Sequence, residues 1–364
     1  MQISFRNLFH KTEVQPKEST WSGETFGLNL RFLLIVTVFV SNAIEPLIQS
    51  DPGLKALFIW IFTFHMPLFV GVTGYFARHN LKGKAGNKVL RQIALQYLIF
   101  QTIYVLLDYW LFQVPGITHN FFVPYLLIWF LMGHLIWRTV MRLFIRWNIR
   151  YPVVLAIGIG LLAGFLPLDG AWFALSRSFV YMPFFIIGYS WNFASIYKFI
   201  RSWMRPVGAI VSAALLIIIY NVAQDINPVW LMNNMTYREL GWLDSELNPI
   251  LLRLGIYAVE FIAAASFLAW VPQRICAITD LGKRTLYVFL IHGLIIRYAV
   301  YMGLYQYIHE GMTTALLIAG SIICTILLAQ PHIRKATHVV IEPNSEAVFG
   351  WVRNGAWRRR MKQS

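Results

Sequence analysis

The sequence predicts an all-α, polytopic membrane protein: one bundle of about ten transmembrane helices. Three observations predict it: 58% of the 364 residues are hydrophobic, only 13% are charged, and the mean hydropathy is +0.57. Soluble domains carry roughly a quarter charged residues. The composition therefore excludes an ordinary soluble enzyme, a disordered chain and a nucleic-acid binder of the basic-patch type. We expect membrane lipids as partners and no nucleic acid.

Ten apolar stretches have the length of a membrane-spanning helix or fall slightly short of it. In order they are residues 27–49, 55–76, 90–113, 121–140, 152–166, 178–196, 206–223, 250–271, 285–307 and 313–330. The fifth is the weakest, because it is short and rich in glycine. The spans predict a polar N-terminal segment over 1–26, a transmembrane domain over 27–330 and a basic tail over 331–364.

The net charge of +15 is mainly an orientation signal. Of the 31 lysines and arginines, 25 fall in alternate loops, at the adjoining span ends and in the two terminal segments; three lie on the opposite side and three inside spans. Positive residues gather on the cytoplasmic side of a membrane protein. The pattern predicts a multi-pass protein of the cell membrane with both termini cytoplasmic. The two cysteines form neither a disulfide framework nor a metal motif, so we expect no metal.

The first span carries the sharpest polar arrangement. Arg31 and Asn42 are eleven residues apart, which at ~100° per residue places them on nearly the same helix face, about 16 Å apart. Glu45 follows on the same side, and Pro46 lacks the N–H that would bind the carbonyl of Asn42. This face offers a cation at its cytoplasmic end and, deeper, an amide, a carboxylate and a free carbonyl. The alternative is a kinked helix whose arginine reaches toward the headgroups.

The second span places His65 near its middle, beside the helix-breaking Pro67. A histidine there is a candidate general base, because its ordinary pKa lies near physiological pH. A hydrogen-bonded structural histidine is the alternative. Gly71 and Gly74 predict close contact with another helix. We interpret His134, in the fourth span, as structural.

Ionisable groups inside a membrane are costly and are functional candidates. His292 and Arg297 are five residues apart and fall on different faces, so we do not expect them to act as a pair. Arg253 and Glu260 share a face but lie about 10 Å apart, so we expect contacts with other helices rather than with each other. Asp108 lies near the outer end of its span, where we expect it to be solvated.

The longest outer loop, 224–249, combines aromatic residues with carboxylates. Two functions fit this composition equally: stacking platforms for a polyhydroxylated sugar, or an aromatic belt at the membrane interface.

Several short sequence motifs follow one another along most of the chain. They are Leu30-Arg31-Phe32 through Ile44-Glu45-Pro46-Leu47; Phe64-His65-Met66-Pro67-Leu68-Phe69 with Gly74-Tyr75-Phe76; Pro124-Tyr125 with Trp129-Phe130-Leu131; Leu175-Ser176-Arg177 with Pro183-Phe184-Phe185 and Gly188-Tyr189; and Leu281-Gly282-Lys283-Arg284-Thr285-Leu286 with Leu290-Ile291-His292-Gly293. In these motifs and their order the sequence resembles the integral-membrane acyltransferase 3 family, in the branch similar to fucose 4-O-acetylases.

The resemblance implies transfer of an acyl group, usually acetyl, from acetyl-CoA or another acyl-CoA to a hydroxyl of a cell-surface or lipid-linked carbohydrate. In the family's first helix an arginine is followed eleven residues later by an essential histidine. Arg31 matches the arginine, but Asn42 stands at the histidine position. An amide cannot act as a general base at pH 7. His65 could take over the base role, Asn42 could orient the acyl carbonyl while another group moves the proton, or the chemistry could be lost. We favour the first.

The roles that follow are these. Arg31, with Lys88 and Arg91, would hold the CoA phosphates, although the two latter residues also fit plain orientation charges. His65 would accept the proton, and Asn42 would donate to the oxyanion. The remaining assignments are His292 as a reserve base, and Arg177, Glu45 and Trp129 as contacts to the acceptor.

Two other functions fit the same features. A transporter or flippase of a lipid-linked sugar would also use proline-broken spans with charges at mid-membrane. A catalytically inactive relative would explain the asparagine in the first span.

Overall fold

The computed structural model describes residues 23–117, 119–166, 172–190, 204–309, 311–346 and 348, which form helices and no strand. The α-helices are α1 Gly23–Ile44, α2 Pro52–Ala77, α3 Gly83–Leu107, α4 Trp129–Arg146, α5 Pro152–Ala163, α6 Leu175–Ser190, α8 Met204–Val222, α9 Val229–Met232, α10 Pro249–Leu268, α11 Ala277–Leu281, α12 Thr285–Tyr301, α13 Met312–Leu328 and α14 Pro331–Ile341. Most of the predicted segment 1–26, the tail from 349, and the end of the sixth predicted span lie outside these residues.

The all-α prediction is confirmed, but ten spans are not. Every predicted span overlaps a helix, yet in the described part of the chain only six helical stretches are long and apolar enough to cross a membrane: Gly23–Leu47, Pro52–Ala77, Gly83–Phe112, Leu126–Arg146, Met204–Val222 and Pro249–Leu268. A seventh arises if α13 and α14, which meet at a bend of 74°, count as one span. The difference is one of length. The 12 residues of α5 extend about 18 Å, against a hydrocarbon core of about 30 Å.

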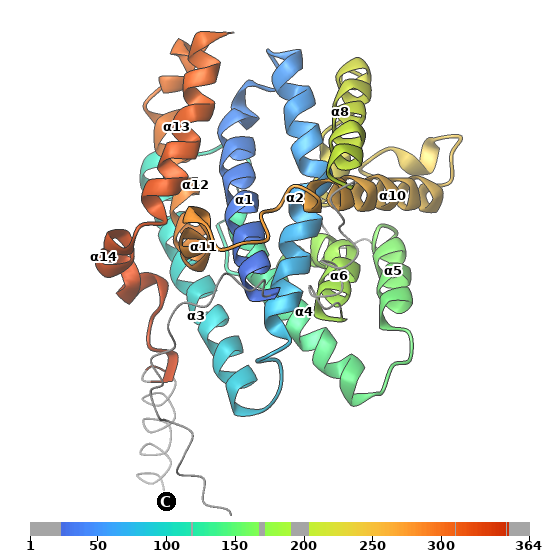
Figure 1. Cartoon of the computed structure of the whole chain (residues 1–364), viewed down its shortest axis with the longest axis vertical. Coiled ribbons are helices and arrows are strands. Elements are labelled where there is room, and N and C mark those ends of the chain that lie inside the picture. Colours follow the sequence, from blue (N-terminus) through green and yellow to red (C-terminus); the bar gives the residue numbers. More distant parts are fainter. Residues whose placement is uncertain are drawn as a thin grey trace, which may run out of the picture.

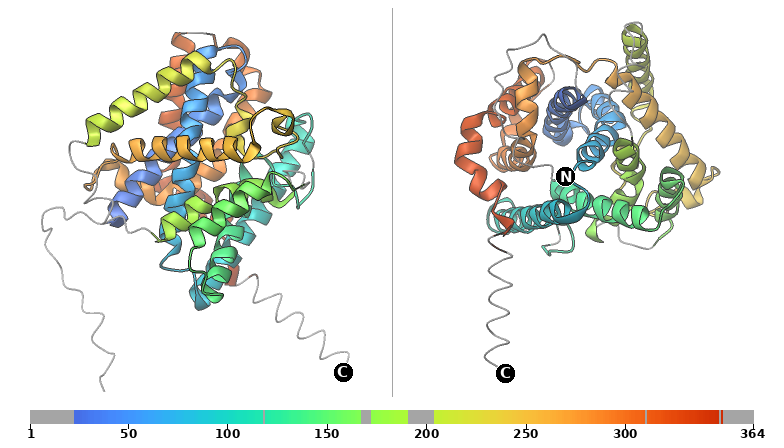
Figure 2. Two further views of the ribbon diagram at one scale, coloured as in Figure 1. Left: turned by 90° about the vertical axis from the view of Figure 1, so that its right-hand side faces the viewer. Right: turned by 60° about the horizontal axis from the view of Figure 1, so that its bottom comes forward.

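Helices α1 and α2 form the centre of the molecule. Figure 2 shows the other helices arranged around this pair. In Figure 1, α12 and α13 lie on one side of α1, while α6, α8 and α10 lie on the side of α2. Helix α1 ends at Ile44 and continues as a 3-10 turn over Glu45–Leu47. Proline at the second position of that turn explains the end, since it has no N–H to extend the helix.

The predicted close contact of α2 occurs with α6. The space beside Gly188 is filled by the backbone of Gly71, and the space beside Gly74 by the backbone around Phe185. Without side chains at these positions the two backbones touch, as small residues allow between membrane helices. This contact carries Arg177, on α6, to the same part of the molecule as His65, on α2.

We expect Gly188→Ala to destabilise the protein, because its Cβ would overlap backbone atoms of α2 and the helices would have to separate. The expected cost is about 1–3 kcal/mol, the usual range for overpacking, read as a lower melting temperature in detergent. Gly158→Ala is the control, because nothing lies within 4 Å of the Cβ it would add. Equal stability of the two variants would refute the backbone contact.

Asp108 is not solvated, contrary to the sequence prediction. It is fully buried, accepts a hydrogen bond from the Tyr125 hydroxyl at 2.7 Å, and lies 2.6 Å from Nε2 of His119. Its helix ends in a π turn over Asp108–Phe112, and the following loop folds back over the carboxylate. Gln101 holds the same loop through the carbonyls of Asn120 and Val123. These contacts fix the chain just before Trp129.

Candidate active site

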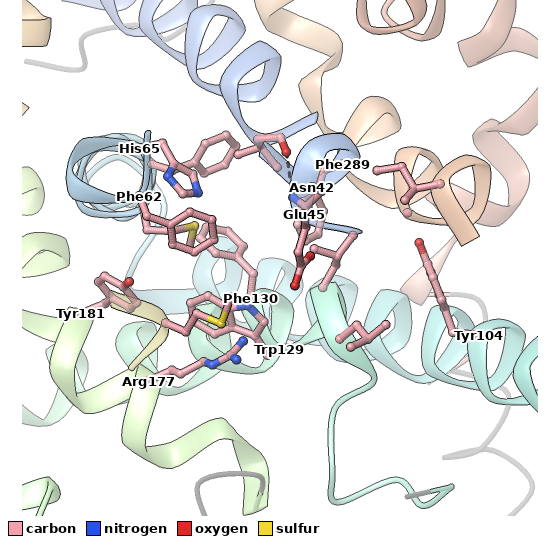
Figure 3. Close-up of a pocket in the computed structure, with 18 of the residues that line it drawn as sticks. Asn42, Glu45, Phe62, His65, Tyr104, Trp129, Phe130, Arg177, Tyr181 and Phe289 are labelled. Atoms are coloured by element: carbon pink, nitrogen blue, oxygen red, sulfur yellow. Dashed lines mark hydrogen bonds between the residues drawn. The ribbon is translucent and has the colours of Figure 1, made fainter. Parts of the chain in front are cut away.

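Two cavities lie among the central helices. The first, called the Asn42 cavity, has an empty volume of about 1050 Å³ including its open mouth. Residues from α1, α2, α3, α4, α6, α9 and α12 line it. Its polar lining consists of Asn42, Glu45, His65, Tyr104, Arg177, Tyr181 and Arg297, and its largest ring is Trp129. Figure 3 shows Glu45, His65 and Arg177 reaching from different helices toward one space. The structure thus brings together five residues of the predicted site: Asn42, Glu45, His65, Trp129 and Arg177.

Asn42 lies in the last turn of α1. One N–H of its amide donates to the carbonyl of Val38 at 2.7 Å, which fixes the side chain along its own helix. An amide has a second N–H and a carbonyl oxygen, and neither makes a hydrogen bond to the residues that the structure describes. Asn42 therefore keeps a donor and an acceptor for a molecule in the cavity.

His65 is buried and lines the Asn42 cavity from α2. Its Nδ1 lies 2.8 Å from the carbonyl oxygen of Ile61. A carbonyl can only accept, so Nδ1 carries the hydrogen, and in the neutral ring Nε2 is left with a lone pair. The edge-on ring of Phe62, 4.5 Å away between centroids, restricts the orientation of the imidazole. This is the state that a general base requires.

Arg177 and Glu45 face each other across the cavity (Figure 3). The guanidinium of Arg177 lies over the ring of Trp129, 5.2 Å from its centroid, and its Nε is buried without a partner. Arg297, on α12, lines the same cavity as a second cation. Neither arginine forms an ion pair with Glu45 within 4 Å. Two cations and one carboxylate are therefore available to hydroxyl or acidic groups of a bound molecule.

The second cavity, called the Arg31 cavity, has an empty volume of about 930 Å³ including its mouth. Its polar lining consists of Arg31, Thr73, Asn80, Gln92, Gln96, His134, Arg138 and Thr285, with no Asp or Glu. Arg31 donates to the Thr285 hydroxyl at 2.9 Å and lies over the ring of Phe76 at 5.2 Å from its centroid. Two cations without a carboxylate suit an anionic ligand, above all one with phosphates.

Three predicted residues do not line either cavity. Lys88 is exposed and pairs with Glu346 at 3.2 Å, and Arg91 lies on α3 next to Gln92, which lines the Arg31 cavity, without lining it itself. His292 is fully buried between helices, with Phe39 5.3 Å away between ring centroids. Its Nδ1 bonds to the carbonyls of Val288 and Phe289, and its Nε2 has no partner. His292, the predicted reserve base, thus has the tautomer that a base requires but lines neither cavity.

Sequence reasoning missed two residues of the Arg31 cavity. His134 was interpreted as structural, but its ring lines the cavity and its buried Nε2 has no partner. Arg138 was counted among the orientation charges, yet it is buried and donates to Asn80 at 2.5 and 2.7 Å. Their spacing of four residues places both on one face of α4, and this shared face is the sequence signal that could have identified them. Arg297, which we did not expect to pair with His292, lines the Asn42 cavity.

Two aromatic rings of the outer loop pack inside the protein instead of facing solvent. Tyr237 and Trp242 are buried and stacked 5.5 Å apart, and the guanidinium of Arg253 lies 5.0 Å from the Trp242 ring centroid. Arg253 also donates to the amide oxygen of Asn233. It forms no ion pair with Glu260, as the sequence predicted. These rings hold the loop against α10.

One comparison with known proteins identifies the family of the chain. The model of the acyltransferase 3 family, described as an acyltransferase domain, matches residues 27–331, from the first turns of α1 to the first residue of α14. The match contains both cavities. No curated protein and no solved structure matches the chain. The match covers most of the chain, and the chain therefore belongs to the acyltransferase 3 family of multi-pass membrane proteins.

Proposed function

We propose that this protein is an O-acyltransferase that takes an acyl group, acetyl in the first instance, from acyl-CoA in the Arg31 cavity and passes it to a carbohydrate hydroxyl in the Asn42 cavity. The observation that carries the proposal is that one face of α1 borders both cavities, with Arg31 in one and Asn42 in the other. The two residues are eleven positions, about 16 Å, apart. The acceptor class follows the resemblance to fucose 4-O-acetylases.

The Arg31 cavity suits the CoA end of the donor. Arg31 and Arg138 supply charge without a competing carboxylate, and glutamine, asparagine and threonine side chains add hydrogen bonds. Arginine binds phosphate through two parallel N–H donors. Because positive residues mark the cytoplasmic side, this cavity would face the compartment that holds acyl-CoA. Lys88 and Arg91 would act on the approach of the anion rather than on its final position.

The Asn42 cavity suits a sugar. It combines a large indole ring with hydrogen-bond donors and acceptors: a carboxylate, two guanidiniums, an amide and two tyrosine hydroxyls. Glu45 and Arg177 would bind acceptor hydroxyls from opposite sides, and Trp129 would support a sugar ring. A free sugar and a lipid-linked glycan present the same hydroxyls to these groups.

The proposed reaction uses Nε2 of His65 as the base. The acceptor oxygen bonds to the thioester carbonyl carbon while its proton passes to Nε2. The free N–H of Asn42 donates to the oxyanion that forms, a contact that strengthens in the transition state. The C–S bond then breaks, and the proton on Nε2 passes to the CoA sulfur. The products are an ester and free CoA.

The test is transfer of radiolabelled acetyl from acetyl-CoA to the glycolipid and polysaccharide fractions of membranes that contain the purified protein. We expect label in one of these fractions, and loss of an acyl mass from cell-surface glycans when the gene is removed. A transporter of a lipid-linked sugar would instead move its substrate across vesicles without releasing CoA. That result would contradict the proposal.

Asn42 tests whether the chemistry persists. We expect Asn42→Ala to lower kcat by about 10²-fold or more, because an oxyanion donor is worth roughly this much, with little change in KM for acetyl-CoA. Ser41→Ala, one position away and bonded only to Val38, is the control. If the parent protein shows no transfer while Asn42→His does, the protein is an inactive relative.

A further inference from the structure

Three phenylalanines separate the two cavities. Phe69, Phe130 and Phe289 are the only residues that line both the Asn42 cavity and the Arg31 cavity within the described part of the chain. Each ring comes from a different helix: α2, α4 and α12 in that order. We call these three residues the phenylalanine partition.

The rings of the partition touch one another. The centroids of Phe69 and Phe130 lie 5.3 Å apart with ring planes at 88°, and those of Phe130 and Phe289 lie 5.6 Å apart at 60°. Edge-to-face pairs at this distance are in van der Waals contact. All three side chains are at least nine-tenths buried. The three rings therefore form a shared apolar wall of the two cavities.

The position of Phe130 is itself supported. Its ring packs edge-on against Trp137, whose indole nitrogen donates to the carbonyl of Ser178 at 2.6 Å. Phe69 lies two residues after Pro67. Phe130 is therefore held in place by the Trp137 indole. Phe69 lies next to a proline, where a helix bends more easily.

The proposed reaction has to cross this boundary, and the inference rests on that proposed function. The CoA phosphates belong with Arg31 on one side, and the sugar belongs with Asn42 and Arg177 on the other. The acyl group and the thioester end of the CoA arm are the parts of the substrates that are narrow and apolar enough to lie among the rings. In the tetrahedral intermediate its carbonyl carbon bonds to the sulfur on one side and the acceptor oxygen on the other, so the acyl chain lies against the partition.

We propose that the phenylalanine partition sets the length of the acyl group that the protein transfers. A methyl group requires only a small displacement of the rings, whereas each further methylene needs space that the rings occupy. A pocket that discriminates by one methylene changes specificity about 10- to 200-fold. The wild-type protein therefore transfers acetyl in preference to butyryl, and removal of a ring relaxes this preference.

The experiment compares initial rates of transfer from labelled acetyl-CoA and butyryl-CoA into the same membrane acceptor fraction. Alanine and leucine variants of Phe69, Phe130 and Phe289 are measured beside the wild type. We expect the butyryl-to-acetyl ratio to rise about tenfold or more in at least one alanine variant and less in the matching leucine variant. Leucine keeps an apolar side chain, so it also serves where the alanine variant does not fold.

Phe144→Ala is the matched control, since Phe144 is a buried phenylalanine on the same helix as Phe130 and lines neither cavity. Its ratio should remain that of the wild type. Wild-type acetyl transfer together with unchanged ratios in all partition variants would overturn this inference while leaving the proposed function intact. A wild-type protein that transfers no acyl group would overturn the proposed function, and the inference would fall with it.

Discussion

Replacing Arg31 by glutamine is expected to lower kcat/KM for acetyl-CoA by about 100-fold or more. A hydrogen bond to a charged group contributes about 1.5–3 kcal/mol, each 1.4 kcal/mol is tenfold, and a guanidinium can make two such bonds to one phosphate. Arg31 is free to do so, because its described protein partners are a neutral hydroxyl and a ring. The measurement is the dependence of transfer rate on acetyl-CoA concentration, with direct calorimetric titration of CoA.

Two variants sharpen this test. Arg31→Lys keeps the charge but loses the planar pair of donors, so it should recover part of the lost affinity and not all of it. Lys88→Gln removes an exposed cation that pairs with Glu346 outside the cavity. An exposed ion pair contributes about 0–1 kcal/mol, so this variant should stay close to the wild type. If Lys88→Gln loses as much CoA affinity as Arg31→Gln, the Arg31 cavity is not the donor site.

The part of the fold that follows from local sequence was predictable. Apolar runs placed a helix at each of the ten predicted spans, and Pro46 marked a break in the first of them, although that span was predicted to run to residue 49 and α1 ends at Ile44. Helix length was less predictable, because hydropathy does not say where a turn begins inside an apolar run. The stretch 121–140 reads as continuous, yet its first residues form a loop that covers Asp108, and the helix proper begins at Trp129.

The site was predictable on a single helix and not between helices. The face shared by Arg31 and Asn42 followed from the helical period alone. His65 and Arg177 line the same cavity because α2 contacts α6. The glycines of α2 predicted a close helix contact but did not indicate which helix it would be with. Arg138 was read as an orientation charge because a basic residue near a helix end is usually that. Burial beside Asn80 gives it another role.

His65→Ala is expected to lower kcat by about 10²–10⁴-fold, the usual contribution of a general base, with KM for acetyl-CoA nearly unchanged because the donor binds in the other cavity. His65→Gln separates chemistry from packing. Its amide N–H can still donate to the carbonyl of Ile61, which now accepts from Nδ1, but it has no group that takes a proton. If His65 holds the helix only, glutamine restores transfer; if His65 is the base, glutamine does not.

His292→Ala completes the comparison, because His292 has the same tautomer and an unpaired Nε2 but lines neither cavity. We expect it to cost stability, through the cavity left beside Phe39, and to leave kcat of the folded fraction within a few-fold of the wild type. A His65→Ala protein that transfers acetyl at the wild-type rate would refute the assignment. If only His292→Ala loses transfer, the base is His292 on α12, and the reacting carbon lies beside that helix.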